Sequence, residues 1–135
     1  SDSVIIHPGK IKTIIGKHAT DSLKAKIKVI RSTNNRKLTN NQIKTIIVDA
    51  VRKFFDINKW EFGQTFNFTL LASYIHNILP VELDSVVLVP TSATHIFGDL
   101  LQVFCKDDEI IQASISVNDI EIVESLNPYV LKQTL

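Results

Sequence analysis

The sequence TNNQIKTIIVDAVRKFF, which runs from Thr39 to Phe55, carries the clearest structural signal in the chain. Apolar side chains recur at the i, i+3, i+4, i+7, i+8 and i+11 spacing that places them on one stripe of an α-helix. These positions are Ile43, Ile46, Ile47, Ala50, Val51 and Phe54. Thr39 and Gln42 have the spacing of a capping box, in which each side chain satisfies a backbone amide at the helix start. The stretch predicts an amphipathic helix from about Asn40 to Phe55, with Phe54 fully buried.

The segment LKAKIKVI, residues 23–30, comes before this helix and alternates between apolar and lysine side chains. A period of two is typical of a strand that is buried on one face and solvated on the other. The predicted buried positions are Leu23, Ala25, Ile27 and Val29, and the predicted cationic positions are Lys24, Lys26 and Lys28.

Four further elements are expected after the first helix. FTLLASYIHNIL, residues 68–79, places Leu71, Tyr74, Ile75 and Ile78 on one helical face, with Asn67 as its cap and Pro80 at its end. The β-branched run LDSVVLVP, residues 83–90, predicts a central strand buried on both faces. LLQVFCK (100–106) and SVNDIEIVES (116–125) are two more strand candidates.

The order of these elements predicts an α+β fold with two layers. Two helices with apolar stripes must bury them against one face of a mixed β-sheet. Turn signals at Pro8-Gly9 and Gly16 indicate that residues 1–21 form an extended basic arm that carries one short strand. The α+β domain is then expected to span residues 22–124, and residues 125–135 to form a C-terminal tail.

The link between the two helices, KWEFGQTFNF (59–68), is rich in aromatic residues. Phe62, Phe66 and Phe68 are expected to bury between the helices and the sheet, and Gly63 to permit a sharp turn. The link is therefore interpreted as a structural joint. Trp60, at its edge, is expected to serve either as core or as an anchor at a protein interface.

The residues that usually carry catalysis or bind metals show no recognisable pattern. His7, His18, His76 and His95 are far apart in sequence, and none has the spacing to a second histidine or cysteine that a zinc site needs. The chain lacks a Gly-rich phosphate loop and a nucleophile elbow. Cys105 is the only cysteine, so no internal disulfide can form and a reducing compartment is expected. The prediction is a protein that is not an enzyme and uses no metal, cofactor or small-molecule substrate.

The distribution of charge leaves a second function open. Residues 1–37 hold nine basic and two acidic side chains, a net +7, whereas the rest hold six basic and twelve acidic, a net −6. A basic amino-terminal third could bind nucleic acid through its phosphates. No aromatic residue precedes Phe54, so this third lacks the stacking side chains that such surfaces usually add. Nucleic-acid binding is therefore the alternative, and contact with protein is the preferred interpretation.

Five aliphatic residues of the predicted arm suggest where such a contact lies. They sit among turn signals, where a monomer has little use for them, so they are expected to dock on another subunit. Together with Trp60, the candidate interface residues are Val4, Ile5, Ile6, Ile14 and Ile15. The expected partner is a second copy of the chain. No segment is long and apolar enough for a membrane helix.

The strand LKAKIKVI, the first helix, the link WEFGQTFNF, the helix TLLASYIHNIL and the strand ELDSVVLVP together resemble the carboxy-terminal domain of the baseplate J-like wedge proteins of contractile-tailed phages. The resemblance covers residues 22–89, and one departure is that LPVELDS lacks the glycine often found at that corner in the family. Over its full length the chain is similar to the C-terminal part of the large baseplate wedge subunits of T-even phages.

This resemblance implies a structural protein of the virion. Wedge subunits of this family are assembled in the host cytoplasm into the tail baseplate. Their copies pair and, with other baseplate wedge subunits, form the inner ring that rearranges when the sheath contracts. The resemblance transfers no catalytic residue. It also accounts for a sequence that begins SDSV and has no methionine, which is expected to be a part of a longer protein.

Overall fold

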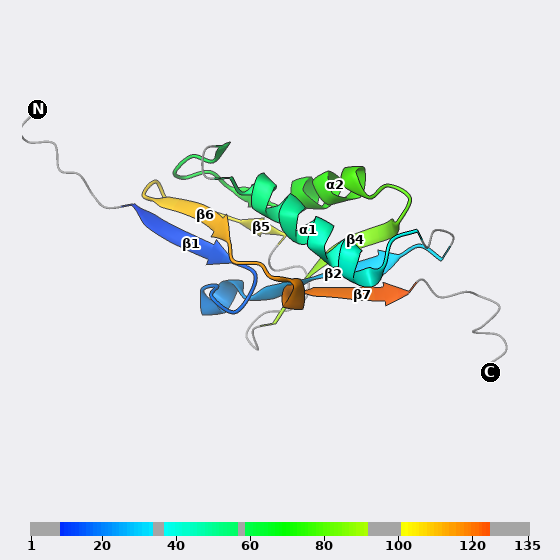
Figure 1. The fold of residues 1–135 in the computed structure, drawn as a ribbon. Helices are drawn as coiled ribbons and strands as arrows, with labels where there is room; N and C mark the ends of the chain where they lie inside the picture. The colour runs from blue at the N-terminus through cyan, green and yellow to red at the C-terminus, as the bar shows by residue number, and fades with distance from the viewer. Residues whose placement is uncertain (1–8, 34–36, 57–58, 92–100, 125–135) are drawn as a thin grey trace, which may run out of the picture.

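The computed structural model describes residues 9–33, 37–56, 59–91 and 101–124, and it has the predicted α+β architecture. Two helices lie side by side on one face of a mixed β-sheet (Figure 1). Among the described residues there are two further strand pairs, residues 10–14 with 109–113 and residues 66–67 with 102–103. In chain order the elements are β1 (Lys10–Ile14), η1 (Asp21–Leu23), β2 (Ala25–Arg31), α1 (Asn40–Phe54), β3 (Phe66–Asn67), α2 (Phe68–Ile78), β4 (Leu83–Pro90), β5 (Gln102–Val103), β6 (Glu109–Ala113), η3 (Val117–Asp119) and β7 (Ile120–Glu124).

The central sheet has the order β4-β2-β7, with β2 antiparallel to β4 and parallel to β7. The alternation predicted for β2 is confirmed, because Ala25, Ile27 and Val29 are buried beneath the helices while Lys26 is exposed. The prediction that residues 83–90 form a central strand is wrong. Among the described strands they form β4, which lies at an edge of the sheet, and β2 lies in the middle. The alternating pattern of β2 is compatible with a central position, because only the face beneath the helices has to be apolar.

The strand pair β1–β6 corrects the predicted extended arm. Residues 10–14 form the short strand expected there, but it pairs in parallel with residues 109–113, so residues 10–21 belong to the domain and do not extend from it. Lys10 to Ile14 form a strand and Asp21–Leu23 a short 3-10 helix, both within the domain. Val4, Ile5 and Ile6 lie outside the described residues. The pairing joins segments about a hundred positions apart, which local patterns do not reveal.

A tight turn after β1 carries the chain back toward β2. Ile15 and Gly16 both have positive φ angles, 66° and 87°. The Ile15 amide donates to the Leu23 carbonyl at 3.1 Å, and the Gly16 amide donates to the Ala25 carbonyl at 3.3 Å. A β-branched residue in this backbone region carries a conformational strain of about 1–3 kcal/mol. The Ile15 side chain is completely buried, and this burial offsets the strain.

Both predicted helices are confirmed. The apolar stripe of α1 is buried at Ile43, Ile47, Ala50 and Val51, and α2 buries Phe68, Leu71 and Ile75. The prediction that Phe54 is fully buried is wrong, because its ring is only partly buried where it lines a surface hollow. α2 ends at Ile78, two residues before Pro80. Asn67 is the first flanking residue of α2, but its side chain makes no capping hydrogen bond. Each of the two late strand candidates forms a strand over part of its length. Within residues 100–106 the strand is Gln102–Val103, and within residues 116–125 it is Ile120–Glu124.

The capping box of α1 gives a first test of the fold. The Gln42 amide donates to Thr39 Oγ1 at 3.1 Å, and the Thr39 amide donates to Gln42 Oε1 at 2.8 Å. We expect Thr39→Ala to lower the free energy of unfolding by about 1 kcal/mol, because one end amide of the helix loses its partner. Urea denaturation measures this change. Thr69→Ala, an exposed substitution in the first turn of α2, is the control and should change stability by less than about 0.5 kcal/mol.

A buried arginine, which sequence reasoning missed, connects β2 to the start of α1. Arg31 is the last residue of β2 and is almost completely buried. Its Nη1 donates to Asn40 Oδ1, and its Nη2 donates to the Leu38 carbonyl. These bonds fix the direction in which the chain enters α1 and so set the position of the helix over the sheet.

Candidate protein interface

The residues predicted to form an interface fall into three groups. Val4, Ile5 and Ile6 lie outside the described residues. Ile14 and Ile15 are 0 % exposed and belong to the hydrophobic core, so the expectation that they dock on another subunit is wrong. They are buried because β1 pairs with β6 and turns under the core. Trp60 is half-buried and lines a surface hollow, so it is the one described candidate with access to a partner.

Trp60 is held by an aromatic cluster at the end of α1. Its indole Nε1 donates to the Phe54 carbonyl at 2.7 Å, which satisfies a carbonyl in the last turn of the helix. Its ring stacks on Phe55 with centroids 5.4 Å apart and an angle of 19° between the planes. Phe66 packs against Phe55 at 5.2 Å and lies 6.5 Å from Trp60, so the three rings contact one another. The indole is therefore fixed in one orientation before any partner arrives.

The hollow beside Trp60 lies between the end of α1, the aromatic link and α2. Its apolar lining includes Phe54, Trp60, Leu70 and Tyr74. Leu70 is 60 % exposed, although it lies on a helix whose other large apolar side chains mostly face the core. A rigid tryptophan next to an exposed leucine is the type of anchor that dominates the energy of many protein interfaces.

Two lysines give the hollow a positive rim. Lys53 and Lys59 both contribute to its lining, and both are exposed. Lys53 forms an ion pair with Asp49 at 3.1 Å. The hydrogen bond to Asp49, and then the charge of that carboxylate, raise the pKa of Lys53. The same carboxylate balances part of the positive charge of Lys53. The hollow therefore suits an apolar side chain from a partner segment that carries negative charge nearby.

The turn at Gly63 separates Phe62 from the rest of the link. The predicted sharp turn is confirmed, because Gly63 has a φ of 78°. The Gln64 amide donates to the Glu61 carbonyl at 3.3 Å, which closes a turn with Phe62 at its tip. Phe66 and Phe68 are buried as predicted, but Phe62 is 54 % exposed, and the prediction of its burial is wrong. Side chains at the tip of a tight turn point away from the core.

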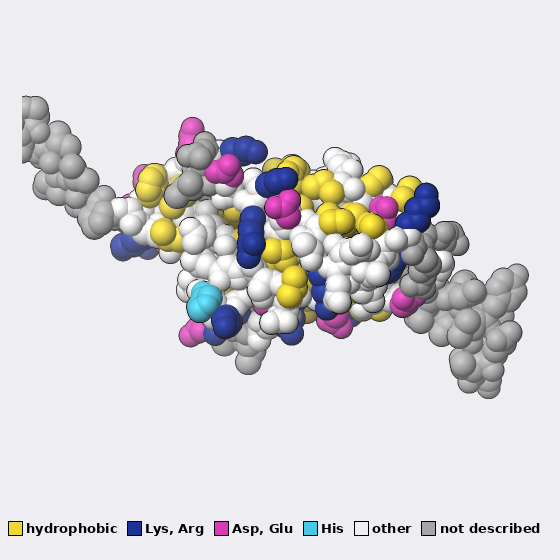
Figure 2. Space-filling view, viewed as in Figure 1, with side chains coloured by type: hydrophobic (Ala, Val, Ile, Leu, Met, Phe, Trp, Pro, Cys, Tyr) yellow, Lys and Arg dark blue, Asp and Glu magenta, His cyan; other side chains and the backbone are white. Residues whose placement is uncertain are grey.

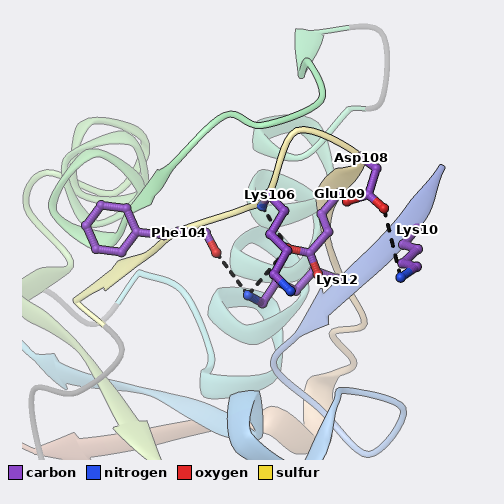
Figure 3. Close-up of polar contacts among 6 residues, drawn as sticks. All are labelled: Lys10, Lys12, Phe104, Lys106, Asp108 and Glu109. Carbon is purple, nitrogen blue, oxygen red and sulfur yellow. Dashed lines mark hydrogen bonds and ion pairs between the residues drawn. The ribbon is translucent and has the colours of Figure 1, made fainter.

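Part of the basic amino-terminal third is paired with acidic side chains. Lys10 lies 3.9 Å from Asp108, and Lys12 lies 3.8 Å from Glu109 (Figure 3). Lys12 also donates to the Phe104 carbonyl at 2.9 Å. On the face seen in Figure 2, basic and acidic side chains are interspersed among hydrophobic ones. These pairs reduce the positive charge that the described part of this third can offer to phosphate.

The reactive side chains of the described residues do not converge on one site. Within residues 9–33, 37–56, 59–91 and 101–124, no group of three histidine, cysteine or acidic residues could hold a metal ion. Cys105 is half-buried, and its burial raises the pKa of the thiol above its ordinary value. The thiol is therefore protonated at neutral pH and a weak nucleophile. His76 lies half-buried on α2, whereas His7 and His95 are outside the described residues.

No protein-family model matches the chain, and no curated protein sequence matches it. In the part of the chain that the structure describes, neither α1 nor α2 could cross a lipid bilayer. The strongest candidate site among the described residues is the Trp60 hollow, in which sequence reasoning identified Trp60 and missed Leu70.

Proposed function

We propose that this chain is a structural domain of a phage tail baseplate wedge that acts through contacts with protein subunits. Its partners are a second copy of itself and other baseplate wedge subunits, and its place is the virion. The observation that carries the proposal is the Trp60 hollow, because it combines a fixed aromatic anchor with an exposed leucine. The sequence resemblance to baseplate J-like proteins supports the choice of assembly.

The location of the chain in the particle tests the proposal directly. Antibodies raised against the chain are applied to purified virions of the phage that encodes it, and bound antibody is detected by immunogold electron microscopy. We expect gold at the distal end of the tail, where the baseplate lies. Gold on the capsid, or particles without label whose disrupted tails also lack the chain by mass spectrometry, would contradict the proposal.

The Trp60 hollow also predicts the effect of one surface substitution. We expect Leu70→Glu in the full-length phage protein to reduce the yield of infectious particles at least about tenfold, because a charge at the rim prevents an apolar contact from closing. The folded domain should keep its stability, since Leu70 is 60 % exposed. Plaque titre and thermal unfolding of the isolated chain measure the two effects.

Val117→Glu provides the matched control. Val117 is 45 % exposed, but it lies in η3, next to α1 and away from the Trp60 hollow. The same loss of apolar surface and gain of charge should leave the titre unchanged. A normal titre for Leu70→Glu, with the altered protein present in the particles, would show that the hollow is not a contact surface.

A further inference from the structure

The outer edge of β4 has main-chain groups that pair with no described strand, and their register is defined by the structure. β4 lies at one edge of the central sheet, and no strand among the described residues pairs with its outer side. The Thr91 amide donates to the Lys24 carbonyl at 2.9 Å, so in this antiparallel ladder Ser85, Val87 and Val89 bond to β2. The N–H and C=O groups of Val86 and Leu88 consequently point outward, away from the sheet.

An apolar groove runs beside these outward groups. A hollow of about 170 Å³ follows the edge of β4, and its lining includes Phe68, Thr69, Ala72, Val86, Leu88 and Leu101. A second, more polar hollow shares Ala72 and Val86 and continues toward His76. α2 thus presents small side chains, at Thr69, Ala72 and Ser73, on the side that faces the edge. A strand placed along β4 therefore has room beneath the helix.

We propose that this edge pairs with β4 of a second copy, antiparallel and about a two-fold axis through Val87. Val86 of each copy then lies opposite Leu88 of the other, and the two edges exchange about four main-chain hydrogen bonds. The result is one continuous sheet of six strands with the two α2 helices on the same face. The small side chains of α2 permit these helices to approach to about 8–10 Å.

The charges along the edge favour a second copy in this orientation. The start of β4 is acidic, with Asp84 exposed and Glu82 just before it. The end is basic, because Lys26 is the register partner of Val89. Lys24, just before β2, lies opposite Thr91, and its ammonium group is paired with Asp21 at 3.3 Å. Antiparallel pairing brings the acidic start of each strand to the basic end of the other, and the two-fold axis repeats this contact. A parallel arrangement would bring like charges together.

Asp84 and Pro90 limit the length of the strand pairing. Asp84 lies at one end of the exposed edge and Pro90 at the other, and both are residues that prevent unlimited strand addition. Pro90 lacks an N–H group but belongs to the outward set, so it costs the β2 ladder no hydrogen bond. The edge therefore accepts one partner strand of matching length. Leu101, which is 50 % exposed beside Leu88, becomes covered in the pair.

Amide hydrogen exchange followed by NMR tests this contact, with Val87 as an internal control. Samples of the chain are compared at a low and a high concentration. We expect exchange at Val86 and Leu88 to slow at least about tenfold in the concentrated sample, because their N–H groups become bonded to the second copy. Exchange at Val87 should be slow in both samples, since its N–H already bonds to β2.

Two other outcomes of this experiment would overturn the proposal. Fast exchange at Val86 and Leu88 in both samples would mean that the edge stays open. Equally slow exchange in both would mean that a segment of the same chain covers it.

A charge exchange tests the orientation separately. We expect Asp84→Lys to weaken self-association about threefold to tenfold, and the addition of Lys26→Glu to restore it. Asp107→Lys is the control, because it makes the same charge change in the exposed turn before β6. Equal weakening by Asp84→Lys and Asp107→Lys would contradict the antiparallel pairing.

This inference rests on the self-contact in the proposed function and not on the phage tail. A chain that pairs through β4 but is absent from baseplates would remove only the proposed place in the virion. A chain found in baseplates whose Val86 and Leu88 amides do not respond to concentration would remove only the β4 contact.

Discussion

Replacement of Phe66 by alanine is expected to lower the free energy of unfolding by about 3–5 kcal/mol. Phe66 is completely buried and is the largest of the fully buried side chains in the described residues. Its ring packs against Phe55 at 5.2 Å and against Phe54 at 6.4 Å. The substitution therefore removes apolar contact and leaves a cavity at the point where the link joins both helices.

Urea denaturation followed by the fluorescence of Trp60, the only tryptophan, measures this change. Phe62→Ala is the matched control, since it makes the same substitution four residues earlier in the link. Phe62 is exposed at the tip of the turn, so we expect a loss below about 1 kcal/mol. Similar losses for the two variants would mean that the aromatic link does not pack as described.

Among the described glycines, Gly16 is expected to be the most sensitive to substitution, and Gly16→Ala should lower the free energy of unfolding by about 3 kcal/mol or more. A Cβ at this position would lie 1.9 Å from the Ser114 carbonyl oxygen, which is far too close for a carbon and an oxygen that are not bonded to each other. The φ of 87° adds strain for any residue with a side chain. Ser114 directly follows β6, and Gly16 lies in the turn after β1. The clash therefore pushes this turn away from the end of β6, the partner strand of β1.

Substitutions at Gly63 and Gly9 are expected to cost less stability than Gly16→Ala. Gly63 also has a positive φ, but its nearest neighbour would be 3.5 Å from a Cβ, so Gly63→Ala should cost about 1–2 kcal/mol. At Gly9 a Cβ would meet only the exposed ring of Phe62, which can rotate away, so Gly9→Ala should change stability by less than about 0.5 kcal/mol. Urea denaturation of the three variants checks the order. A Gly16→Ala protein as stable as Gly9→Ala would contradict the close approach of the turn to β6.

Elements defined by local patterns were predictable from the sequence. α1 has a six-residue apolar stripe and a capping box, and both signals arise from residues three or four positions apart. β2 has a strict period of two, which identifies its buried face without knowledge of its neighbours. These two elements, with α2, are enough to predict an α+β fold.

Features that depend on distant partners were not predictable in this way. Ile14 and Ile15 resemble part of an arm because their partner strand, β6, lies far along the chain. The run of valines in β4 is compatible with a central or an edge position, since periodicity does not reveal strand order. Arg31 gave no signal because its partners, Asn40 and Leu38, are only brought together by the fold.

The candidate interface shows the same division. Trp60 was identifiable because a lone tryptophan beside a glycine turn is unusual, but its role as core or anchor depends on how α2 packs beside it. Leu70 stands out only once the buried face of α2 is known, since the stripe of Leu71 and Ile75 then leaves it outside. The outward groups of β4 follow from a hydrogen-bond register and leave no trace in composition.

Sedimentation equilibrium of the unaltered chain, over a roughly hundredfold range of concentration and at low and high salt, tests the central claim of self-assembly most directly. We expect a monomer–dimer equilibrium that persists at high salt, because main-chain bonds and apolar contacts supply the affinity and the charges mainly set the orientation. A monomer at every concentration and both salt levels would contradict it.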